Sequence, residues 1–309
     1  MSPQDGTFLP FHEDELAAQM LAGQRPGRAA IRPFLPDQHR EFFRLLPYLF
    51  IATGDADGWP IASVLSGPAG FAHSPDPLTL RVDALPLTND PAAAGLAAGN
   101  RIGLLGLDLS TRRRNRANGT VTAVDPKGFA VAVEQSFGNC AQYIQTRTPT
   151  AHTRSPLAME ALPGLDVSAR RLIETADTLF VASRSRAGIG ESGGLDISHR
   201  GGRPGFVDVQ DDTLVVPDFR GNRFFNTLGN LLGDPRCGLL FVDFATGDLL
   251  QLQGTAAIDW TAAARQPAGT QRSWRVRIER GWRRRGALPF EWTFGDYAPT
   301  TLGTGRWRD

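Results

Sequence analysis

Short apolar runs separated by turns rich in glycine, proline and aspartate dominate the chain. Helical spacing of apolar residues is confined to a few short stretches. Strand-like runs occupy residues 48–53, 60–65, 78–82, 101–108, 120–124 and 129–134, and helices are expected at 13–21, 37–46 and 91–98, with Asp37 as a cap and Pro91 in a first turn. This pattern predicts a mainly β fold, a β-barrel with a few helices.

The pattern then repeats. Phe71 and Phe206, Gly103 and Gly238, and Gly119 and Gly254 are matched pairs with similar neighbours, each pair 135 residues apart (206 − 71, 238 − 103, 254 − 119). The first strand is offset by 130 residues (180 − 50), which places a five-residue insertion near residues 188–194. An internal repeat of this length predicts two similar β-rich units in tandem. We expect an N-terminal helical adaptor at 1–46, one unit at 47–146, a linker at 147–175 and the second unit at 176–309.

One stretch, Val215 to Leu232, has the pattern of a strand, a turn and a helix. The polar residues at the start of this helix are Arg220, Asn222, Arg223, Asn226 and Thr227, and the expected apolar face is Phe224, Phe225, Leu228, Leu231 and Leu232. A helix N-terminus attracts an anion, and two guanidinium groups favour phosphate. The stretch therefore predicts a phosphate-anchoring turn, and a charged, capped helix end is the alternative.

The first unit has lost this chemistry. At the 135-residue offset, Leu85 and Thr88 replace the two arginines and Asp90 replaces Phe225. A carboxylate at that position would repel a phosphate. The repeat thus predicts one anion site for each chain.

Two further motifs bear on a ligand. In 196–206, a strand that ends in a glycine turn, Ser198 and Arg200 alternate to one face with His199 opposite. Such a face can donate hydrogen bonds to a flat heteroaromatic ring and stabilise negative charge on it; an ordinary edge strand is the alternative. The G-x-G-x-x-G match at 188–193 lacks a following helix, so we interpret it as a hairpin turn and not a dinucleotide site.

The densest basic segment is 111–119, which includes Arg114 and Arg116. It has three interpretations: a nucleic-acid contact, a strand that delivers alternate arginines to an anionic ligand across an interface, or a solvated loop.

Residues 136–144 are expected to begin a helix, with Asn139 as its cap and Tyr143 within reach of a ligand. We interpret Cys140 as structural because no histidine lies nearby in the sequence.

Composition narrows the function classes. The net charge of +1 argues against binding to bulk nucleic acid or an anionic membrane, and 41% hydrophobic with 21% charged residues is typical of a soluble globular protein. The two cysteines lie far apart, which fits a reduced compartment and no metal site. No apolar run is long enough to span a bilayer. We expect a soluble, cytoplasmic protein.

Together these segments resemble the pyridoxamine 5′-phosphate oxidase-like family of FMN-binding split β-barrels, in its tandem, two-barrel branch. The resemblance covers about residues 40–295 and rests on four segments: 111–119, 136–144, 196–206 and 219–227. It implies two split β-barrels that form a pseudo-dimer, with FMN in the cleft between them. A further homodimer is consistent with the family.

The resemblance also implies the site residues and an oxidoreductase activity. FMN-binding residues would be Ser198, His199, Arg200, Val216, Pro217, Asp218, Arg220, Asn222, Arg223, Asn226 and Thr227 from the second barrel, with Arg114, Arg116, Asn139 and Tyr143 from the first. The substrate is unknown, and NAD(P)H or oxygen are candidate reaction partners. No acid–base pair can be chosen. Alternatives are a flavin or haem carrier or sensor and, third, a nucleic-acid-binding module.

One departure from the family pattern concerns its usual substrate. The second barrel has Leu-Leu-Gln-Leu-Gln-Gly254 where true pyridoxamine phosphate oxidases resemble Arg-Gln-Val-Arg-Val-Glu-Gly. This departure argues against a vitamin B6 oxidase.

Overall fold

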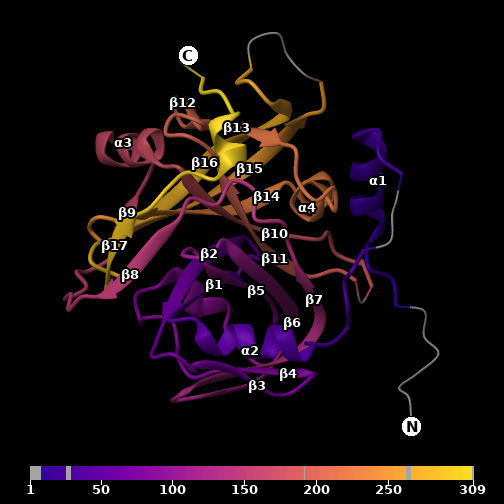
Figure 1. The fold of residues 1–309 in the computed structure, drawn as a ribbon, viewed down its shortest axis with the longest axis vertical. Coiled ribbons are helices and arrows are strands. Elements are labelled where there is room, and N and C mark those ends of the chain that lie inside the picture. The colour runs from indigo at the N-terminus through magenta and orange to yellow at the C-terminus, as the bar shows by residue number, and fades with distance from the viewer. Residues whose placement is uncertain (1–7, 26–28, 191, 262–265, 308–309) are drawn as a thin grey trace.

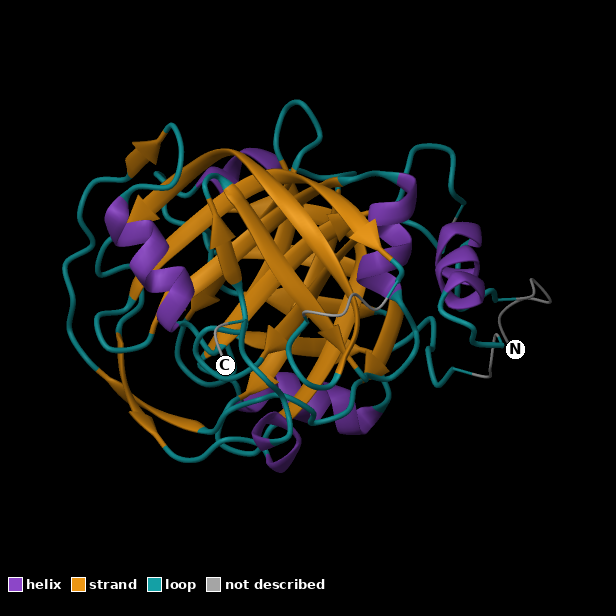
Figure 2. Ribbon diagram, turned by 90° about the horizontal axis from the view of Figure 1, so that it is seen from above, coloured by secondary structure: helices purple, strands orange, loops and turns teal. Residues whose placement is uncertain are grey.

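The computed structural model describes residues 8–25, 29–190, 192–261 and 266–307. Two large antiparallel sheets lie against each other, and short helices cover their margins (Figures 1 and 2). The predicted fold class is confirmed: the protein is mainly β and contains the same sheet twice.

The first sheet contains β1 (Tyr48–Gly54), β2 (Pro60–Ser66), β3 (Ala72–Asp76), β4 (Thr79–Val82), β5 (Arg101–Asp108), β6 (Arg113–Asp125) and β7 (Gly128–Gly138). Its strand order is β2-β1-β5-β6-β7-β4-β3. The two short strands expected at 120–124 and 129–134 are the ends of the long hairpin β6–β7. Residues 113–119 of the arginine-rich segment form the first half of β6, and the alternate residues Arg114 and Arg116 contact the second repeat.

The second sheet contains β10 (Thr178–Arg184), β11 (Leu195–Gly201), β12 (Asp208–Gln210), β13 (Thr213–Phe219), β14 (Arg236–Asp243), β15 (Asp248–Asp259) and β16 (Thr270–Arg284). Its order, β11-β10-β14-β15-β16-β13-β12, reproduces that of the first sheet strand by strand. Both sheets also carry a bulge at the same place, between Asn118 and Gly119 and between Gln253 and Gly254. A shared bulge position supports duplication of one unit, since bulges are specific features of a fold.

The two sheets meet around an approximate two-fold axis. Phe50 and Phe180, the matched residues of β1 and β10, stack with ring centroids 3.7 Å apart and an interplanar angle of 17°. Matched glycines let the strands approach: a side chain on Gly103 would meet the backbone of Asp196, and one on Gly238 would meet the backbone of Ile61. The interface between the repeats is therefore symmetric at its centre.

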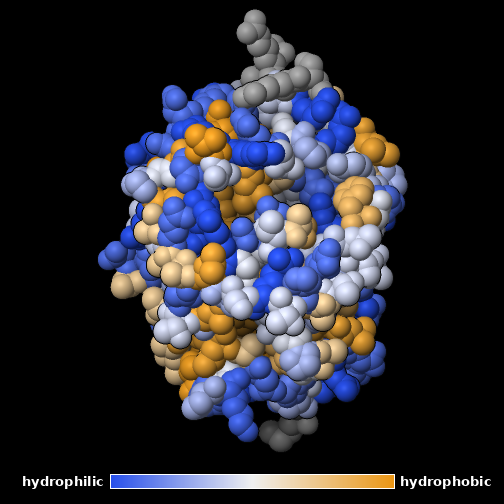
Figure 3. Space-filling model, turned by 90° about the vertical axis from the view of Figure 1, so that its left-hand side faces the viewer, coloured by the Kyte–Doolittle hydropathy of each residue, from blue (hydrophilic) through white to orange (hydrophobic). Residues whose placement is uncertain are grey.

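The remaining strands and the helices α2 (Asp37–Leu45) and α3 (Val167–Thr175) flank the two repeats. β8 (Arg147–Ala151) pairs with β17 (Phe290–Phe294), and β9 (Glu160–Leu162) pairs with β16, so the expected linker contains regular structure. α2 and α3 each precede the first strand of a repeat. On the side of the molecule at the left of Figure 1, hydrophilic and hydrophobic residues are interspersed (Figure 3).

Three local expectations need correction. Pro36, not Asp37, is the N-cap of α2, and the helix expected at 91–98 is a short 3-10 helix, η1 (Pro91–Gly95), capped by Asp90. The helix expected after residue 139 is wrong. That segment is irregular because it bonds to the second repeat: the Tyr143 hydroxyl donates to the Arg220 carbonyl, and Gln145 donates to the Gly202 carbonyl.

The N-terminal helix α1 (Glu13–Leu21) packs against α4 (Asn226–Gly233) of the second repeat, as Figure 1 shows. Gly229 permits this approach, since a side chain there would meet the Glu15 backbone. α5 (Pro299–Leu302) lies near the C-terminal end. Among the described residues, no helix is long and apolar enough to cross a membrane.

Candidate functional site

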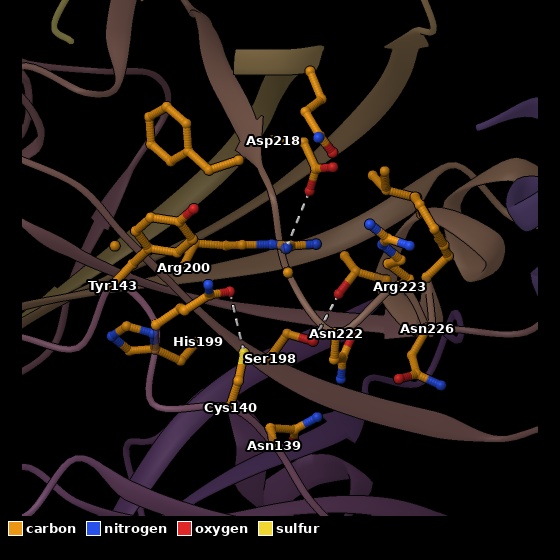
Figure 4. A pocket seen from close by; sticks show the side chains of 18 of the residues that line it. Asn139, Cys140, Tyr143, Ser198, His199, Arg200, Asp218, Asn222, Arg223 and Asn226 are labelled. Atoms are coloured by element: carbon orange, nitrogen blue, oxygen red, sulfur yellow. Dashed lines mark hydrogen bonds and ion pairs between the residues drawn. The ribbon is translucent and has the colours of Figure 1, made fainter. Parts of the chain in front are cut away.

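A pocket between the two repeats gathers most of the predicted site residues (Figure 4). We call it the interface pocket. The predicted residues that line it are Arg114, Arg116, Asn139, Tyr143, Ser198, His199, Arg200, Pro217, Asp218, Asn222, Arg223, Asn226 and Thr227. The first four come from the first repeat and the rest from the second, so the pocket requires both.

Two predicted residues do not line the pocket. Val216 is fully buried in the core of the second repeat, because alternate residues of β13 face opposite sides of the sheet. The Arg220 side chain is exposed, and only its carbonyl takes part, by accepting from Tyr143. The predicted apolar face also changes: α4 begins at Asn226, so Phe224 and Phe225 precede it, and Leu232 is exposed.

A hydroxyl pair lies at the inner end of the pocket. The Thr227 hydroxyl donates to the Ser198 hydroxyl oxygen over 2.7 Å, and Arg116 Nη2 donates to the same oxygen over 2.5 Å. Arg116 Nη1 donates to Asn226 Oδ1 over 3.1 Å and lies 3.3 Å from Asp196 Oδ2. These groups place one buried guanidinium beside two hydroxyls and one amide at the start of α4, a combination suited to an oxyanion.

Helix α1 fixes this arrangement from outside. Asn226 Nδ2 donates to Glu15 Oε1 over 2.5 Å, and His12 Nε2 lies 2.9 Å from Asn230 Oδ1. Burial raises the pKa of Glu15 to about 8, against the lowering effect of the Asn226 hydrogen bond. Glu15 is not among the residues predicted from the sequence, because its partner lies 211 residues further along the chain.

The pocket wall of the first repeat carries Arg114. Its Nη1 lies 3.4 Å from His199 Nδ1, and its Nη2 lies 3.8 Å from the Cys140 sulfur. Because arginine only donates, His199 Nδ1 acts as the acceptor and Nε2 carries the proton. Burial, reinforced by Arg114 and Arg200, lowers the pKa of His199 well below its usual value, and burial lowers that of Arg114 to about 10. His199 is therefore a neutral donor at pH 7.

The pocket wall of the second repeat contains a buried carboxylate between two arginines. Asp218 accepts from Arg272 over 3.2 Å and pairs with Arg200 over 3.2 Å. Burial raises the pKa of Asp218, and both guanidiniums oppose that shift. Arg272, which is also absent from the predicted site residues, lies 4.9 Å over the Phe225 ring. No local pattern marks Arg272, because β16 brings it to the pocket only through pairing with β13.

The loop before α4 is held in an unusual conformation. Arg223 and Phe225 have φ angles of 63° and 61°, in the left-handed region. Phe224 packs edge-on against Phe11, at 5.5 Å between centroids, and Gln19 donates to its carbonyl. The N-terminal segment thereby stabilises the loop that carries Asn222 and Arg223 to the pocket.

Four buried or half-buried donors of the pocket have no hydrogen-bond partner within the described part of the chain. They are the Nε atoms of Arg114, Arg116 and Arg200, and Nε2 of His199. A buried donor that makes no hydrogen bond destabilises the protein by about 1–3 kcal/mol. A ligand rich in acceptor atoms fits this set. Among the described residues, no cluster of three histidine, cysteine or acidic side chains could hold a metal ion.

The glycine-rich segment rejected as a dinucleotide motif connects the antiparallel strands β10 and β11, which confirms a hairpin connection. Glu191 within it lies outside the described residues. The strand interpretation of the arginine-rich segment agrees with the structure: Arg114 and Arg116 of β6 face the second repeat.

In the comparison with protein families, residues 35–161 match the family model described as pyridoxamine 5′-phosphate oxidase. No curated protein matches the chain.

Three solved structures similar to this chain each match about one repeat. HupZ of Group A Streptococcus is 18% identical with a TM-score of 0.30, and the match covers 38% of this chain and 91% of HupZ. The haem storage protein HutZ of Vibrio cholerae is 12% identical with a TM-score of 0.29, and the match covers 40% and 96%. An FAD-binding protein of Mesorhizobium loti is 11% identical with a TM-score of 0.28, and the match covers 42% and 99%.

The matched segment contains the whole first sheet, and the second sheet repeats its strand order. By this match, residues 35–161 are similar to the pyridoxamine 5′-phosphate oxidase family.

Proposed function

We propose that the chain binds one FMN in the interface pocket and acts as an FMN-dependent oxidoreductase. The observation that carries the proposal is the set of unpartnered donors, among the described residues, on Arg114, Arg116, His199 and Arg200 around one pocket between the repeats. Flavin mononucleotide offers acceptors of both required kinds, a phosphate and ring carbonyl and nitrogen atoms.

The proposed phosphate-binding residues are Arg116, Ser198, Asn226 and Thr227, with Arg223 at the loop. Arg116 is buried and already donates to the hydroxyl and amide that would share the ligand, so little reorganisation is needed. Buried guanidinium groups bind phosphate strongly because water does not screen them.

The remaining donors are proposed to face the flavin ring. When bound, FMN accepts and returns a hydride or single electrons. Arg114 and Arg200 would stabilise negative charge on the ring, and neutral His199 would donate from Nε2. Asp218 holds Arg200 in position through their ion pair. The proposal includes NAD(P)H as a candidate electron donor and a further homodimer. It names no substrate.

The departure from the vitamin B6 oxidase pattern does not concern this pocket. The segment Leu249–Gly254 lies in β15, which contacts β2 of the first repeat, and the matched strand at the interface pocket is β6, with Arg114 and Arg116. The segment therefore gives no argument about which substrate the interface pocket accepts.

Haem is a second candidate, favoured by one observation: Nε2 of buried, neutral His199 has no partner among the described residues. Nε2 could ligate iron in the tautomer that carries the ring proton on Nδ1, at the loss of the Arg114 contact to Nδ1. The absorbance spectrum of the purified protein separates the two. Flavin bands that persist through gel filtration support FMN, and a Soret band supports haem. A featureless spectrum that FMN addition does not change contradicts the flavin proposal.

Turnover is tested separately. Anaerobic photoreduction of the FMN-loaded protein, followed by air or by NADPH with an oxidised acceptor, distinguishes an oxidoreductase from a carrier. Reoxidation no faster than that of free reduced FMN, with no NADPH consumption, would support the carrier alternative.

A further inference from the structure

The duplication creates a second place that corresponds to the interface pocket. Strand register identifies its residues: Ser198 pairs with Val181 across β10–β11, and Ser63 pairs with Ile51 across β1–β2. Val181 and Ile51 are matched, since they pair with Leu239 and Leu104 of the matched strands β14 and β5. Ser63 is therefore the counterpart of Ser198.

The partner repeat supplies counterparts in the same way. Arg116 pairs with Leu105 and Phe137, and Gln251 pairs with Leu240 and Trp282 at the matched positions. Gln251 thus replaces Arg116. Phe137 and Trp282 are therefore matched aromatic residues. Arg284, two residues after Trp282, occupies the position that Asn139, two residues after Phe137, has at the interface pocket. The arginine of the interface pocket, Arg116, is in β6, whereas the arginine of the second place, Arg284, is in β16, the strand next to the counterpart of β6.

A carboxylate occupies the centre of this second place. Asp90 Oδ2 accepts from the Ser63 hydroxyl over 2.5 Å and from Arg284 Nη1 over 2.6 Å. Asp90 Oδ1 accepts from Gln251 Nε2 over 3.1 Å and from the Ala92 amide over 3.0 Å. Four donors from both repeats thus converge on one buried carboxylate, which is 3% exposed. We call Ser63, Gln251, Arg284 and the Ala92 amide the Asp90 cradle.

We propose that Asp90 is a built-in anion that closes the second of two equivalent oxyanion sites. We infer that the cradle binds a small free carboxylate once the Asp90 side chain is removed. The counterpart of Asp90 is Phe225, which packs beside Arg272 and supplies no carboxylate from that position. In the interface pocket the carboxylate beside Ser198 and Arg116 is instead Asp196 of β11, which accepts from the Ser198 hydroxyl over 3.2 Å and lies 3.3 Å from Arg116 Nη1. A carboxylate and a phosphate present the same kind of acceptor oxygens to such donors.

The cradle has the charge that this role requires. Arg284 is 3% exposed, and burial lowers its pKa while Asp90 raises it. Without an anion, a guanidinium would lie buried and unpaired, which is strongly unfavourable. The inference rests on strand register and contacts alone and does not depend on FMN as the ligand of the interface pocket.

Asp90→Gly tests the proposal, because acetate then matches the deleted side chain atom for atom. Thermal unfolding of the full chain is measured in sodium acetate and in sodium chloride at equal ionic strength. We expect a lower melting temperature than wild type in chloride and a saturable rise of a few degrees in acetate. Wild type and the double variant Asp90→Gly/Arg284→Met should show no acetate-specific rise.

Equal melting temperatures of Asp90→Gly in acetate and chloride would overturn the proposal and leave Asp90–Arg284 as an ordinary buried salt bridge. If Asp90→Gly does not fold in chloride, recovery of folded protein from refolding in acetate becomes the readout. Failure to recover it in acetate, or the same gain in the double variant, overturns the proposal as well.

Discussion

The interface pocket and the Asp90 cradle are built on equivalent strands of the two repeats. The pocket is open, whereas the Asp90 side chain fills the cradle. In the pocket, the Ser198 hydroxyl donates to Asp196 and accepts from Arg116 and Thr227, and other donors that line the pocket lack partners in the described chain. In the cradle, the equivalent hydroxyl of Ser63 donates to a carboxylate that also neutralises Arg284. A ligand site can therefore be lost while its hydrogen-bond donors are kept, because one internal carboxylate can accept from all of them.

The largest expected effect comes from the residue that differs most between the two places. Arg116→Met should weaken FMN binding by about 30-fold or more, because truncating a buried, hydrogen-bonded charge costs about 2–5 kcal/mol. The matched variant in the cradle, Gln251→Met, should leave the affinity within about twofold. Fluorescence titration of FMN measures both, and circular dichroism checks that both variants are folded. Equal losses in the two variants would remove the distinction between pocket and cradle.

The second prediction uses a residue with a role at the pocket only. Glu15, which faces Asn226, His12, Arg116 and Asp196, has a pKa raised to about 8 by burial. The folded state therefore holds the proton more tightly than the unfolded chain. The stabilisation is complete below pH 4.5 and is lost as pH rises toward 8, by at most a few kcal/mol at about 1.4 kcal/mol per pKa unit.

Glu15→Gln should abolish this dependence. Urea unfolding between pH 5 and pH 9 should show the free energy of unfolding of wild type falling relative to the variant up to about pH 8 and then levelling. A constant difference between the two proteins over that range would contradict a buried, protonated Glu15.

The third prediction tests what the two places share. Phe50→Leu and Phe180→Leu alter the two halves of one stacked pair on the pseudo-axis. Each should lower the free energy of unfolding by about 1 kcal/mol, since an aromatic pair contributes about that much beyond burial. Chemical denaturation measures both. A difference of more than about twofold between the two would show that the centre of the interface is not symmetric in energy.

The smallest effect is expected at the mouth of the pocket. Arg223→Ala should weaken FMN binding by about threefold to tenfold, with a loss that shrinks at high salt, because an exposed guanidinium is screened. Arg220→Ala is the matched control and should have no effect, since its side chain does not line the pocket. Equal losses would return Arg220 to the phosphate-binding set that the sequence predicts.

The sequence predicts the parts of this molecule that depend on local pattern and on repetition. Most strands, α1 and the equivalence of the two units follow from apolar alternation and the 135-residue offset, and Ser198, Thr227 and Arg116 follow from the family resemblance. These features are encoded within a few residues or in one fixed spacing.

Contacts between distant segments could not be predicted. The helix expected after Asn139 fails because its hydrogen bonds go to the other repeat, and Arg272 reaches the pocket through a neighbouring strand. The alignment of the two repeats predicts that Asp90 takes the position of Phe225 and that its carboxylate repels phosphate. Its capture by Ser63 and Arg284 requires the register of four strands from both repeats.

The contact of α1 with α4 also sets the order in which the pocket can form. His12 and Asn230 are 218 residues apart, and Glu15 and Asn226 are 211 residues apart, so α1 is synthesised long before α4 and can dock only after α4 has been made. Until then its buried face has no surface to cover, and closing so long a segment is slow compared with local folding. Completion of the second repeat is therefore the step that allows the N-terminus to lock the loop before α4.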